Sequence, residues 1–493
     1  MKPSSKKYDE LEPRHVWTHF ASMSEVPRES KKEERIIAWA HEIAKRLGFE
    51  SLEDETGNVI VVVPATEGSE DAPTIVLQAH LDMVCEKNAG TDHDFDVDPI
   101  RLVVEDGDDG PMVRAEGTTL GADNGIGVCL ALAAAQDPDV RHPAMELLFT
   151  VDEETGMTGA IGLDASKITG RTLLNLDTEE DGILTVGCAG GCDSELTWTF
   201  DAEPVAGPGP TWRIEVRGLR GGHSGGDIHE SRGAATKILA RTLAAASAQS
   251  ELRLVHLEAG SKRNAIPREG HAIVVGHGDA LRDAAAKLQG LGRVESQEPE
   301  LEVQVSEASI EEATALTAGD TSRLLDALLA LPHGVLTMHR EIEGLTESSN
   351  NLGILATETT ASKKIVQAVC LSRSSIESRL DETISRIAAV ARLSGARHET
   401  DSRYPGWAPD LDSPVLEVCR RVHEDLFGRT ALVEATHGGL ECGLLGARIP
   451  GLDMVSLGPR IEGAHSPDER TWESSVVYSW KYLVGILDEL AGS

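Results

Sequence analysis

The sequence predicts an α/β fold in which one sheet domain is interrupted by an inserted α+β domain. In the first part of the chain, short apolar strands alternate with helices, and polar residues directly follow the strands. This is the pattern of a sheet covered by helices. The composition changes at the Pro- and Gly-rich segment 202–210, and the α/β pattern returns near residue 408. We therefore expect a domain made of residues 1–190 and 408–493, with residues 191–407 inserted.

The first part of the chain contains the segments of a covered sheet. Apolar residues recur every three or four positions between residues 31 and 47, and Gly48 follows them, which is typical of a helix and its end. The runs 58–63 and 74–77 are almost wholly apolar, as in buried parallel strands. The other expected elements are a helix after residue 14, a hairpin within 97–113, a helix over 126–136, and strands over 144–151 and 172–176.

The inserted segment carries a repeated pattern. Residues 212–217 alternate between apolar and polar side chains, as in a strand with one exposed face. Twice, over 212–246 and over 364–393, a strand is followed by a long helix, which predicts a duplicated arrangement. Further elements expected there are strands over 252–258, 271–276 and 301–306 and helices over 279–291 and 320–331. The last part of the chain should form helices over 415–427, from 439 and over 472–491, with strands over 430–434 and 452–457.

Length and composition restrict the function. A chain of 493 residues is longer than one hydrophobic core usually serves, so two or three domains are expected. With 46 basic and 82 acidic residues, the formal charge of -36 argues against binding a phosphate backbone, which needs concentrated Lys and Arg. Seven scattered cysteines, an odd number, favour free thiols in a reducing compartment. Since neither a signal segment nor an apolar run of roughly 18 residues is present, we expect a cytoplasmic protein that does not bind membranes.

A histidine and an aspartate closely follow the strand over 74–77. His80 and Asp82 are two positions apart, and side chains at that spacing point to the same side of a strand. A carboxylate beside an imidazole can orient that imidazole toward a metal ion. Because a histidine followed by such an aspartate also arises from an ordinary local hydrogen bond, its meaning depends on the residues downstream.

Three carboxylates and a second histidine follow at matching places. Asp123 comes after a tight Gly-Ala turn, and His465 lies in a loop. Glu154 and Asp177 each follow a strand, where ligands of α/β sheets gather. Two imidazoles and three carboxylates suit two divalent ions of the zinc, manganese or cobalt type. Two dications, three carboxylates and one bridging hydroxide sum to zero charge, and such a cluster can hold a hydroxide at neutral pH.

Glu153 and Glu154 are neighbours in the chain. On an extended backbone their side chains point opposite ways, so that one binds metal while the other faces a water molecule as a general base. These acidic residues also have ordinary structural explanations, with Asp123 as a helix N-cap and Glu153 with Glu154 as an acidic loop. For His465 the alternative is an exposed loop histidine.

The order of these motifs resembles the M20 family of di-metal peptidases. The motifs that carry the resemblance are Ala79-His-Leu-Asp82, Leu120-Gly-Ala-Asp-Asn124, Thr150-Val-Asp-Glu-Glu-Thr-Gly156, Asn175-Leu-Asp177, Gly221-Gly-His-Ser-Gly-Gly226 and Gly463-Ala-His465. Two further segments, Leu81-Asp-Met-Val-Cys-Glu-Lys-Asn88 and His437-Gly-Gly-Leu-Glu-Cys-Gly443, are similar to the branch of the family that hydrolyses Xaa-His dipeptides. The resemblance implies a catalytic sheet domain with residues 191–407 as a substrate-binding lid.

The resemblance also implies the metal ligands and the base. Two metal ions, zinc with cobalt or manganese as alternatives, are held by five residues: His80 and Asp177 on one ion, Glu154 and His465 on the other, and Asp123 bridging both. Asp82 then supports His80, and Glu153 deprotonates the bridging water.

In the lid, the resemblance implies contacts with a small peptide. His223 donates a hydrogen bond to the tetrahedral oxygen. Arg373 grips the C-terminal carboxylate, with Asn264 beside it. His437 and Glu441 are further substrate-binding candidates. The alternatives are that His223 is only a loop residue and that Arg373 is a surface arginine.

The expected reaction is hydrolysis of Xaa-His dipeptides, with β-Ala-His included, by a metal-bridged hydroxide. The lid is about twice as long as in simpler relatives, so one chain is expected to complete its own site, as a monomer or a homodimer. One alternative is a related di-metal hydrolase that acts on N-acyl amino acids or tripeptides. The other is a non-catalytic binding protein on the same fold, against which the full set of ligands argues.

Overall fold

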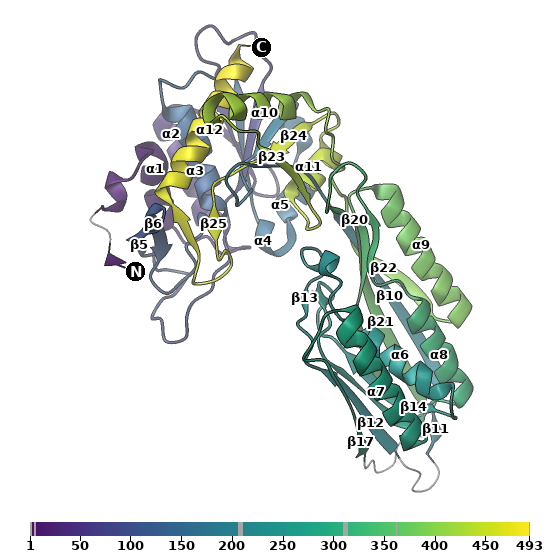
Figure 1. The fold of residues 1–493 in the computed structure, drawn as a ribbon. Helices are drawn as coiled ribbons and strands as arrows, with labels where there is room; N and C mark the ends of the chain where they lie inside the picture. The colour runs from purple at the N-terminus through teal and green to yellow at the C-terminus, as the bar shows by residue number, and fades with distance from the viewer. Residues whose placement is uncertain (1, 4–5, 206–210, 309–313, 361, 493) are drawn as a thin grey trace. The chain divides into compact units, whose positions relative to one another are not determined.

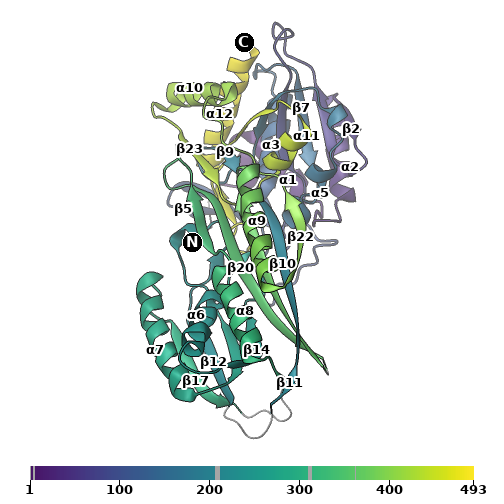
Figure 2. The same ribbon diagram turned by 90° about the vertical axis from the view of Figure 1, so that its right-hand side faces the viewer.

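The computed structural model describes residues 2–3, 6–205, 211–308, 314–360 and 362–492, and the chain forms two compact units (Figures 1 and 2). The sheet unit comprises residues 1–187, 409–435 and 440–493, and the inserted unit comprises residues 188–408 and 436–439. From the sequence, the domain boundaries were expected at 190/191 and 407/408, with residues 436–439 in the sheet domain. Part of the loop expected over 202–210, residues 206–210, lies outside the described residues.

The sheet unit is built on an eight-stranded sheet in the order β2-β3-β7-β4-β8-β24-β9-β23. Its strands are β2 (Glu50–Glu53), β3 (Val59–Val63), β4 (Ile75–His80), β7 (Met145–Thr150), β8 (Thr172–Asn175), β9 (Ile183–Cys188), β23 (Leu432–Thr436) and β24 (Asp453–Ser456). β4 pairs in parallel with β7 and β8, and β24 pairs in parallel with β8. The ends of β4, β7 and β8 therefore meet at one edge of the sheet, where ligands gather in α/β folds.

The direction of β3 corrects an expectation. Its apolar run, like that of β4, predicted a parallel strand, but β3 pairs antiparallel with both β2 and β7. An apolar run reports that both faces of a strand are covered, and it carries no information on the direction of the neighbouring strand. The prediction of a buried strand is correct, and the prediction of its direction is wrong.

Apart from the short helices α4 and α5, which were not expected, the helices of the sheet unit follow the expected segments. They are α1 (Arg14–Ser24), α2 (Glu34–Leu47), α3 (Ala122–Gln136), the short α4 (Glu153–Gly156) and α5 (Thr158–Gly162), α10 (Pro414–Phe427), α11 (Glu441–Arg448) and α12 (Glu473–Ala491). α2 ends at Gly48, whose φ of 85° is the left-handed conformation that glycine adopts at helix ends. α3 packs on β4, and α1 and α12 pack on α3. α3 itself carries mostly small or apolar side chains on all its faces, and its residues 122–134 are all buried. This suits a helix in the middle of its layer.

A smaller sheet of five strands belongs to the same unit. Its order is β1-β5-β6-β26-β25, from β1 (Lys2–Pro3), β5 (Leu102–Gly107), β6 (Gly110–Ala115), β25 (Ile461–Glu462) and β26 (Arg470–Trp472). β5 and β6 form the hairpin expected within 97–113. β26 pairs with β6, so the loop between β25 and β26, which carries His465, is anchored at both ends.

The inserted unit is built on a nine-stranded sheet with helices. The order is β17-β12-β16-β14-β20-β21-β10-β22, and β19 pairs with β20. Its strands are β10 (Gly190–Asp201), β12 (Thr211–Arg217), β14 (Arg253–Ala259), β16 (Gly270–Val275), β17 (Glu302–Ala308), β19 (Gly334–Met338), β20 (Thr346–Thr359), β21 (Lys363–Ser374) and β22 (Arg397–Tyr404). Its helices are α6 (Ala235–Ser247), α7 (Gly278–Glu295), α8 (Ala318–Ala330) and α9 (Glu377–Ser394). Buried side chains such as Trp198, Leu239, Leu325 and Ile387 join strands and helices into one core.

Two halves of this sheet have the same order of elements. One half runs β12, α6, β14, β16, α7, β17, and the other, apart from the additional strand β19, runs β10, α8, β20, β21, α9, β22. They meet where β14 pairs with β20. Duplication of the inserted unit stays a prediction, which this order supports.

Three long strands of the inserted unit, β10, β20 and β22, are absent from the elements expected from the sequence. β20 begins with Thr-Glu-Ser-Ser-Asn-Asn, in which the glutamate and the two asparagines are residues that strands generally disfavour. Ser349, Asn350 and Asn351 are nevertheless fully buried there. Their tertiary surroundings, rather than their strand propensity, therefore determine the conformation of this segment.

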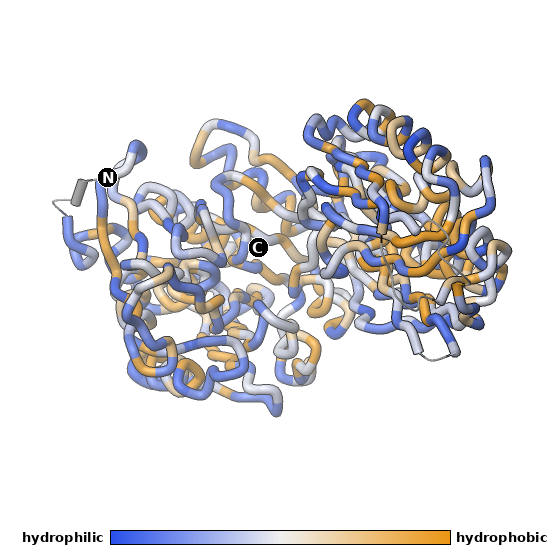
Figure 3. The backbone as a smooth tube through the Cα atoms, turned by 90° about the horizontal axis from the view of Figure 1, so that it is seen from below, coloured by the Kyte–Doolittle hydropathy of each residue, from blue (hydrophilic) through white to orange (hydrophobic). Residues whose placement is uncertain are grey.

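Hydropathy follows the division into units. In Figure 3 the hydrophobic stretches, in orange, lie mostly inside each unit, and hydrophilic stretches are frequent along the outer loops. Among the described residues, none of the helices combines the length and the hydrophobicity that crossing a bilayer requires.

Candidate active site

His80, the last residue of β4, faces two carboxylates. Its Nε2 atom lies 3.1 Å from Oδ1 of Asp123 and 3.5 Å from Oδ1 of Asp177, the second residue after β8. Its other ring nitrogen, Nδ1, lies 3.2 Å from the backbone oxygen of Asp82 and 3.4 Å from its Oδ1 atom. Asp82 can therefore orient the ring while Nε2 points at the two carboxylates.

His465 makes the matching contact from the loop between β25 and β26. Its Nε2 atom lies 3.1 Å from Oδ2 of Asp123 and 3.0 Å from Oε2 of Glu154. Asp123 thus turns one oxygen toward each imidazole. The ligand atoms of His80, Asp123 and Asp177 lie within 4.8 Å of one another, and so do those of Asp123, Glu154 and His465. Two triads that share Asp123 result.

Local backbone geometry presents these side chains. Asp123 lies in the first turn of α3, where it and Asn124 depart from helical backbone angles. Before α4, Asp152 has a φ of 53°, and its side chain accepts hydrogen bonds from Thr155 and Thr158. His465 also has a positive φ, of 62°. Left-handed backbone at non-glycine residues costs energy, which is typical of functional sites.

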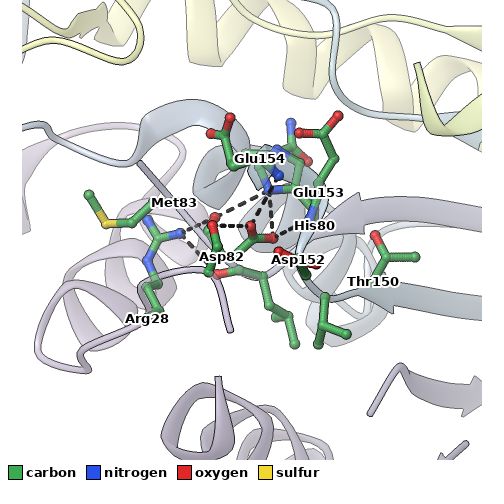
Figure 4. A network of polar contacts seen from close by, with 12 residues as sticks. Arg28, His80, Asp82, Met83, Thr150, Asp152, Glu153 and Glu154 are labelled. Carbon is green, nitrogen blue, oxygen red and sulfur yellow. Dashed lines mark hydrogen bonds and ion pairs between the residues drawn. The ribbon is translucent and has the colours of Figure 1, made fainter. Parts of the chain in front are cut away.

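The backbone of Glu153 and Glu154 differs from the expectation. The two residues were expected on an extended backbone, with side chains pointing opposite ways, but they begin the short helix α4. Asp82, which is fully buried, accepts hydrogen bonds from their backbone N–H groups at 3.1 and 3.2 Å (Figure 4). Ser30 Oγ donates a further hydrogen bond to Asp82 at 2.8 Å. Asp82 therefore holds the start of α4 as well as the ring of His80.

The carboxylates of the two triads favour a positive charge among them. Burial by itself lowers the pKa of His80, but Asp177 and Asp123 outweigh it and raise that pKa well above its usual value. Hydrogen bonds to Asp123 and Glu154 raise the pKa of His465 to about 11. Burial raises the pKa of Asp177 to about 6, because several negative charges share a site that excludes water. A cation bound among these carboxylates removes that repulsion.

Two buried carboxylate oxygens indicate whether the cluster suits metal ions. Among the described residues, Glu154 Oε1 and Asp177 Oδ1 are buried and have no hydrogen-bond partner. Buried polar atoms are normally satisfied, so these two oxygens are suited to binding a cation. Imidazole nitrogens and carboxylate oxygens in two triads are the donors that divalent zinc, cobalt or manganese accept. The residues therefore fit a pair of divalent cations.

A second group of possible ligands lies on the inserted unit and differs in character. His256, Glu258 and His271 come together on β14 and β16, and His256 Nε2 lies 3.3 Å from Glu258 Oε2. Glu258 is exposed, and the charge of Arg213 acts on His271. A nearby cation and free access of water both weaken the attraction for a metal ion.

His223 lies on β13 (Gly222–His223), which pairs with β15 (Ala265–Ile266). Asn264 directly precedes β15. The N–H group of Gly226 donates a hydrogen bond to His223 Nδ1 at 3.0 Å. Because Nδ1 accepts this hydrogen bond, the neutral ring carries its own proton on Nε2. Burial and the charge of Arg373 lower the pKa of His223, which keeps the ring neutral. Its Nε2–H group is thus available as a donor.

Arg373 and Asn264 line one pocket of about 420 Å³ in the inserted unit. Arg373 is only 5% exposed, so it is not a surface arginine. Tyr404 accepts a hydrogen bond from its Nη1 atom at 2.9 Å, and its buried Nε atom has no hydrogen-bond partner among the described residues. A buried guanidinium with a free donor is suited to binding an anion.

His437 and Glu441 are close in sequence but belong to different units. His437 Nε2 lies 2.7 Å from Ser349 Oγ, and burial lowers its pKa to about 3, so the ring is neutral. Glu441 begins α11, and its Oε2 atom accepts hydrogen bonds from Gln78 and Thr150, both at 2.7 Å. Burial raises the pKa of Glu441 to about 7.

The polar residues around the cluster include several that sequence reasoning missed. Gln78, two positions before His80 on β4, also accepts a hydrogen bond from Asn175 at 2.6 Å. The period of two along a strand was a signal for Gln78, because it places this side chain on the side of His80. Arg28 and Glu469 are buried beside the cluster, and no local pattern marks them.

Comparison with known proteins gives close and distant relatives. The chain is 39% identical over 485 residues to the cytosol non-specific dipeptidase of Escherichia coli, covering 98% of each. It is 39% identical to the crystal structure of the aminoacylhistidine dipeptidase of Vibrio alginolyticus, with a TM-score of 0.89 and coverage of 98% of both chains. The aminopeptidase PepT of Bacillus cereus shares the fold, with a TM-score of 0.60 at 19% identity over 98% of this chain and 99% of that one. The sequence pattern of peptidase family M20/M25/M40 matches residues 76–489, so the protein belongs to this family of metallopeptidases.

Proposed function

We propose that the protein is a dipeptidase that hydrolyses the peptide bond of Xaa-His dipeptides, β-Ala-His included, with two divalent metal ions. The observation that carries this proposal is the pair of imidazole and carboxylate triads that share Asp123. The dipeptidase names of the relatives from E. coli and V. alginolyticus, each aligned over 98% of this chain, support dipeptides as substrates, and the aminoacylhistidine dipeptidase name of the second supports the Xaa-His class.

Five residues are proposed to hold the ions, most readily Zn²⁺, with Co²⁺ or Mn²⁺ as alternatives: His80 and Asp177 on one ion, Glu154 and His465 on the other, and Asp123 on both. Two such ions, when bound, lower the pKa of a water molecule and polarise the scissile carbonyl. The two unpartnered carboxylate oxygens, on Glu154 and Asp177, support this assignment.

Glu153 is proposed as the general base. Its carboxylate takes a proton from the attacking water and returns that proton to the nitrogen of the leaving amine. Asp82 supports this role because it accepts the backbone N–H groups of Glu153 and Glu154, which fixes the first turn of α4. The same aspartate contacts Nδ1 of His80, so it positions a ligand and the base together.

The inserted unit is proposed as the lid that binds the rest of the substrate. His223 donates its Nε2 proton to the tetrahedral oxygen. Arg373 binds the C-terminal carboxylate, with Asn264 in the same pocket, and thereby measures the length of the peptide. The neutral ring of His437 and the buried carboxylate of Glu441 are proposed as further substrate contacts.

We further propose that the protein is cytoplasmic and that one chain completes its own site, as a monomer or a homodimer. The name of the E. coli relative, a cytosol dipeptidase, supports the location. The repeated order of elements in the inserted unit supports a lid of double length.

The test is a panel of substrates assayed with the metal-loaded protein and with protein stripped by a chelator. Gly-His and β-Ala-His should be hydrolysed, and an N-acetyl amino acid and a tripeptide should be poor substrates. Activity should disappear on chelation and return with Zn²⁺, Co²⁺ or Mn²⁺. Preference for the N-acetyl compound or the tripeptide would refute the proposed substrate class, and activity unchanged by chelation would refute the metal centre.

A further inference from the structure

Two buried charged side chains outside the proposed ligand set hold the backbone beside the candidate metal centre. Arg28 precedes α2, and Glu469 lies between His465 and β26. Each is only 2% exposed. Both bind the backbone of the segments that carry the proposed ligands, rather than the ligand side chains themselves.

Glu469 joins two ligand-bearing segments. Its Oε2 atom accepts the N–H groups of Leu120 and Gly121 at 2.7 and 2.9 Å. Its Oε1 atom accepts those of Ala122 and Asp123 at 2.7 and 3.2 Å. Four consecutive backbone amides thus converge on one carboxylate. Because Glu469 lies in the loop of His465, this contact ties that loop to the turn of Asp123.

Arg28 joins the same turn to a third segment. Its Nη1 atom donates to the backbone oxygens of Leu81 and Asp82, both at 3.1 Å, and its Nη2 atom donates to the backbone oxygen of Gly121 at 2.5 Å. The backbone oxygen of Arg28 in turn accepts the N–H group of Met83 at 3.1 Å. The guanidinium therefore links the corner after His80 to the turn before Asp123, as Figure 4 shows for its contacts near Asp82 and Met83.

The turn before Asp123 is shaped around this guanidinium. Gly121 has a φ of 70°, and a Cβ atom there would lie 2.2 Å from Nη2 of Arg28. A Cβ atom at Gly125 would lie 2.9 Å from the same nitrogen. Glycine at both positions thus leaves the room that the arginine occupies. Burial lowers the pKa of Arg28, and the charge of Glu469 acts against that effect.

We propose that Arg28 and Glu469 are positioning residues that hold the segments of His80, Asp123 and His465 at the separation that two metal ions need. The proposal rests on the metal centre of the proposed function. Asp123 is the shared residue of both triads, so the backbone that carries it must stay fixed relative to both histidines. Charge-assisted hydrogen bonds to buried backbone groups provide this rigidity, because breaking them leaves those groups unsatisfied.

The test measures metal binding by Glu469→Gln and by Arg28→Lys. A glutamine has one acceptor oxygen in place of two, and a lysine cannot reach carbonyl groups on two segments in a fixed fork. Both variants should bind Zn²⁺ about tenfold or more weakly, in the range known for residues behind metal ligands. Affinity is measured by competition with a chromophoric chelator, and the absorption spectrum of the Co²⁺-loaded protein reports changed ligand geometry.

Glu146→Gln is the matched control. Glu146 is also a buried carboxylate that accepts two consecutive backbone N–H groups, of Thr169 and Gly170, at 3.0 Å each. It lies near the start of β7, whereas His80 lies at the end of the neighbouring strand β4. This variant should lose thermal stability but keep the metal affinity and the Co²⁺ spectrum of the parent.

Each outcome decides the matter. If Glu469→Gln and Arg28→Lys keep the parent affinity within twofold, or if Glu146→Gln weakens metal binding equally, the positioning role is refuted. If Glu469→Gln does not fold, Arg28→Lys decides by the same criteria. A parent protein that binds no metal ions refutes the proposed function instead, which separates the two failures.

Discussion

The two units hold their candidate site residues in opposite electrostatic settings. In the sheet unit, buried carboxylates surround two histidines and raise the pKa of both, so the site favours cations. In the inserted unit, Arg373 is buried and its Nε atom has no hydrogen-bond partner within the described part of the chain, and the pKa values of His223 and His437 are lowered, so those residues favour an anion or a neutral acceptor. Under the proposed function, this difference corresponds to a division of work, in which one unit would bind metal ions and move protons and the other would bind the oxygens of the substrate.

The largest expected effect belongs to the sheet unit. Glu153→Ala should lower kcat about 10³-fold, because general base catalysis contributes on that scale, while both metal ions stay bound. Steady-state kinetics and metal analysis of the same preparation check this result. Glu180→Ala, which removes an exposed carboxylate from the loop after β8, is the control and should stay near the parent rate. A near-normal kcat for Glu153→Ala would show that another residue is the base.

In the inserted unit, His223→Ala should lower kcat by about 10²-fold or more with metal content unchanged, because it removes one donor to the tetrahedral oxygen. His277→Ala, at the N-terminus of α7, is the control for loss of an exposed histidine. A change in KM alone would indicate that His223 binds the substrate without stabilising the transition state.

Mixing the two inactive variants sharpens the comparison between units. If one chain completes its own site, Glu153→Ala and His223→Ala chains stay inactive when they are unfolded and refolded together. If the histidine acts in a partner chain, mixed dimers contain a complete site and activity returns. The parent protein treated in the same way controls for the yield of refolding.

Arg373→Met should lower kcat/KM about 10- to 100-fold for dipeptides, since charge-assisted hydrogen bonds contribute about 1.5–3 kcal/mol. The decisive comparison uses Gly-His and its C-terminal amide. The parent should prefer the free carboxylate, and the variant should lose that preference. Equal discrimination by both proteins would exclude Arg373 as the carboxylate contact.

The smallest effect concerns stability and a buried histidine remote from the proposed ligands. His19 donates from Nε2 to Gln136 at 2.7 Å, and burial lowers its pKa to about 4 from 6.5. The neutral ring therefore stabilises the fold fully above pH 6.5, and this stabilisation is lost as the pH falls from 6.5 toward 4. In His19→Gln the decline of unfolding free energy should be shallower by up to about 1.4 kcal/mol per pH unit.

Urea unfolding at pH 7 and pH 5 measures this difference, with His15→Gln on the same helix as the control. Parallel curves for His19→Gln and the parent would mean that His19 does not titrate with folding.

Much of the fold was predictable because its signals are local. The apolar period of α2 and the glycine after it, and the apolar runs of β4 and β7, mark these elements by composition and spacing. The direction of β3 and the existence of β20 were not predictable in this way. β20 carries buried Ser and Asn side chains that bind distant segments, as when Asn351 donates to the backbone oxygens of Arg263 and Ala265.

The candidate site divides along the same line. The sequence by itself determined which residue types follow the strand ends, because polar residues after apolar runs are visible in the chain, and these include His80, Glu154 and Asp177. Only the tertiary structure decided that α4 is helical at Glu153 and that Asp82 holds its N–H groups.

It also decided the contacts of Arg28 and Glu469, whose partners are backbone groups far away in sequence. Backbone amides and carbonyls are the same at every residue, so a side chain that binds them leaves no pattern in the partner's sequence.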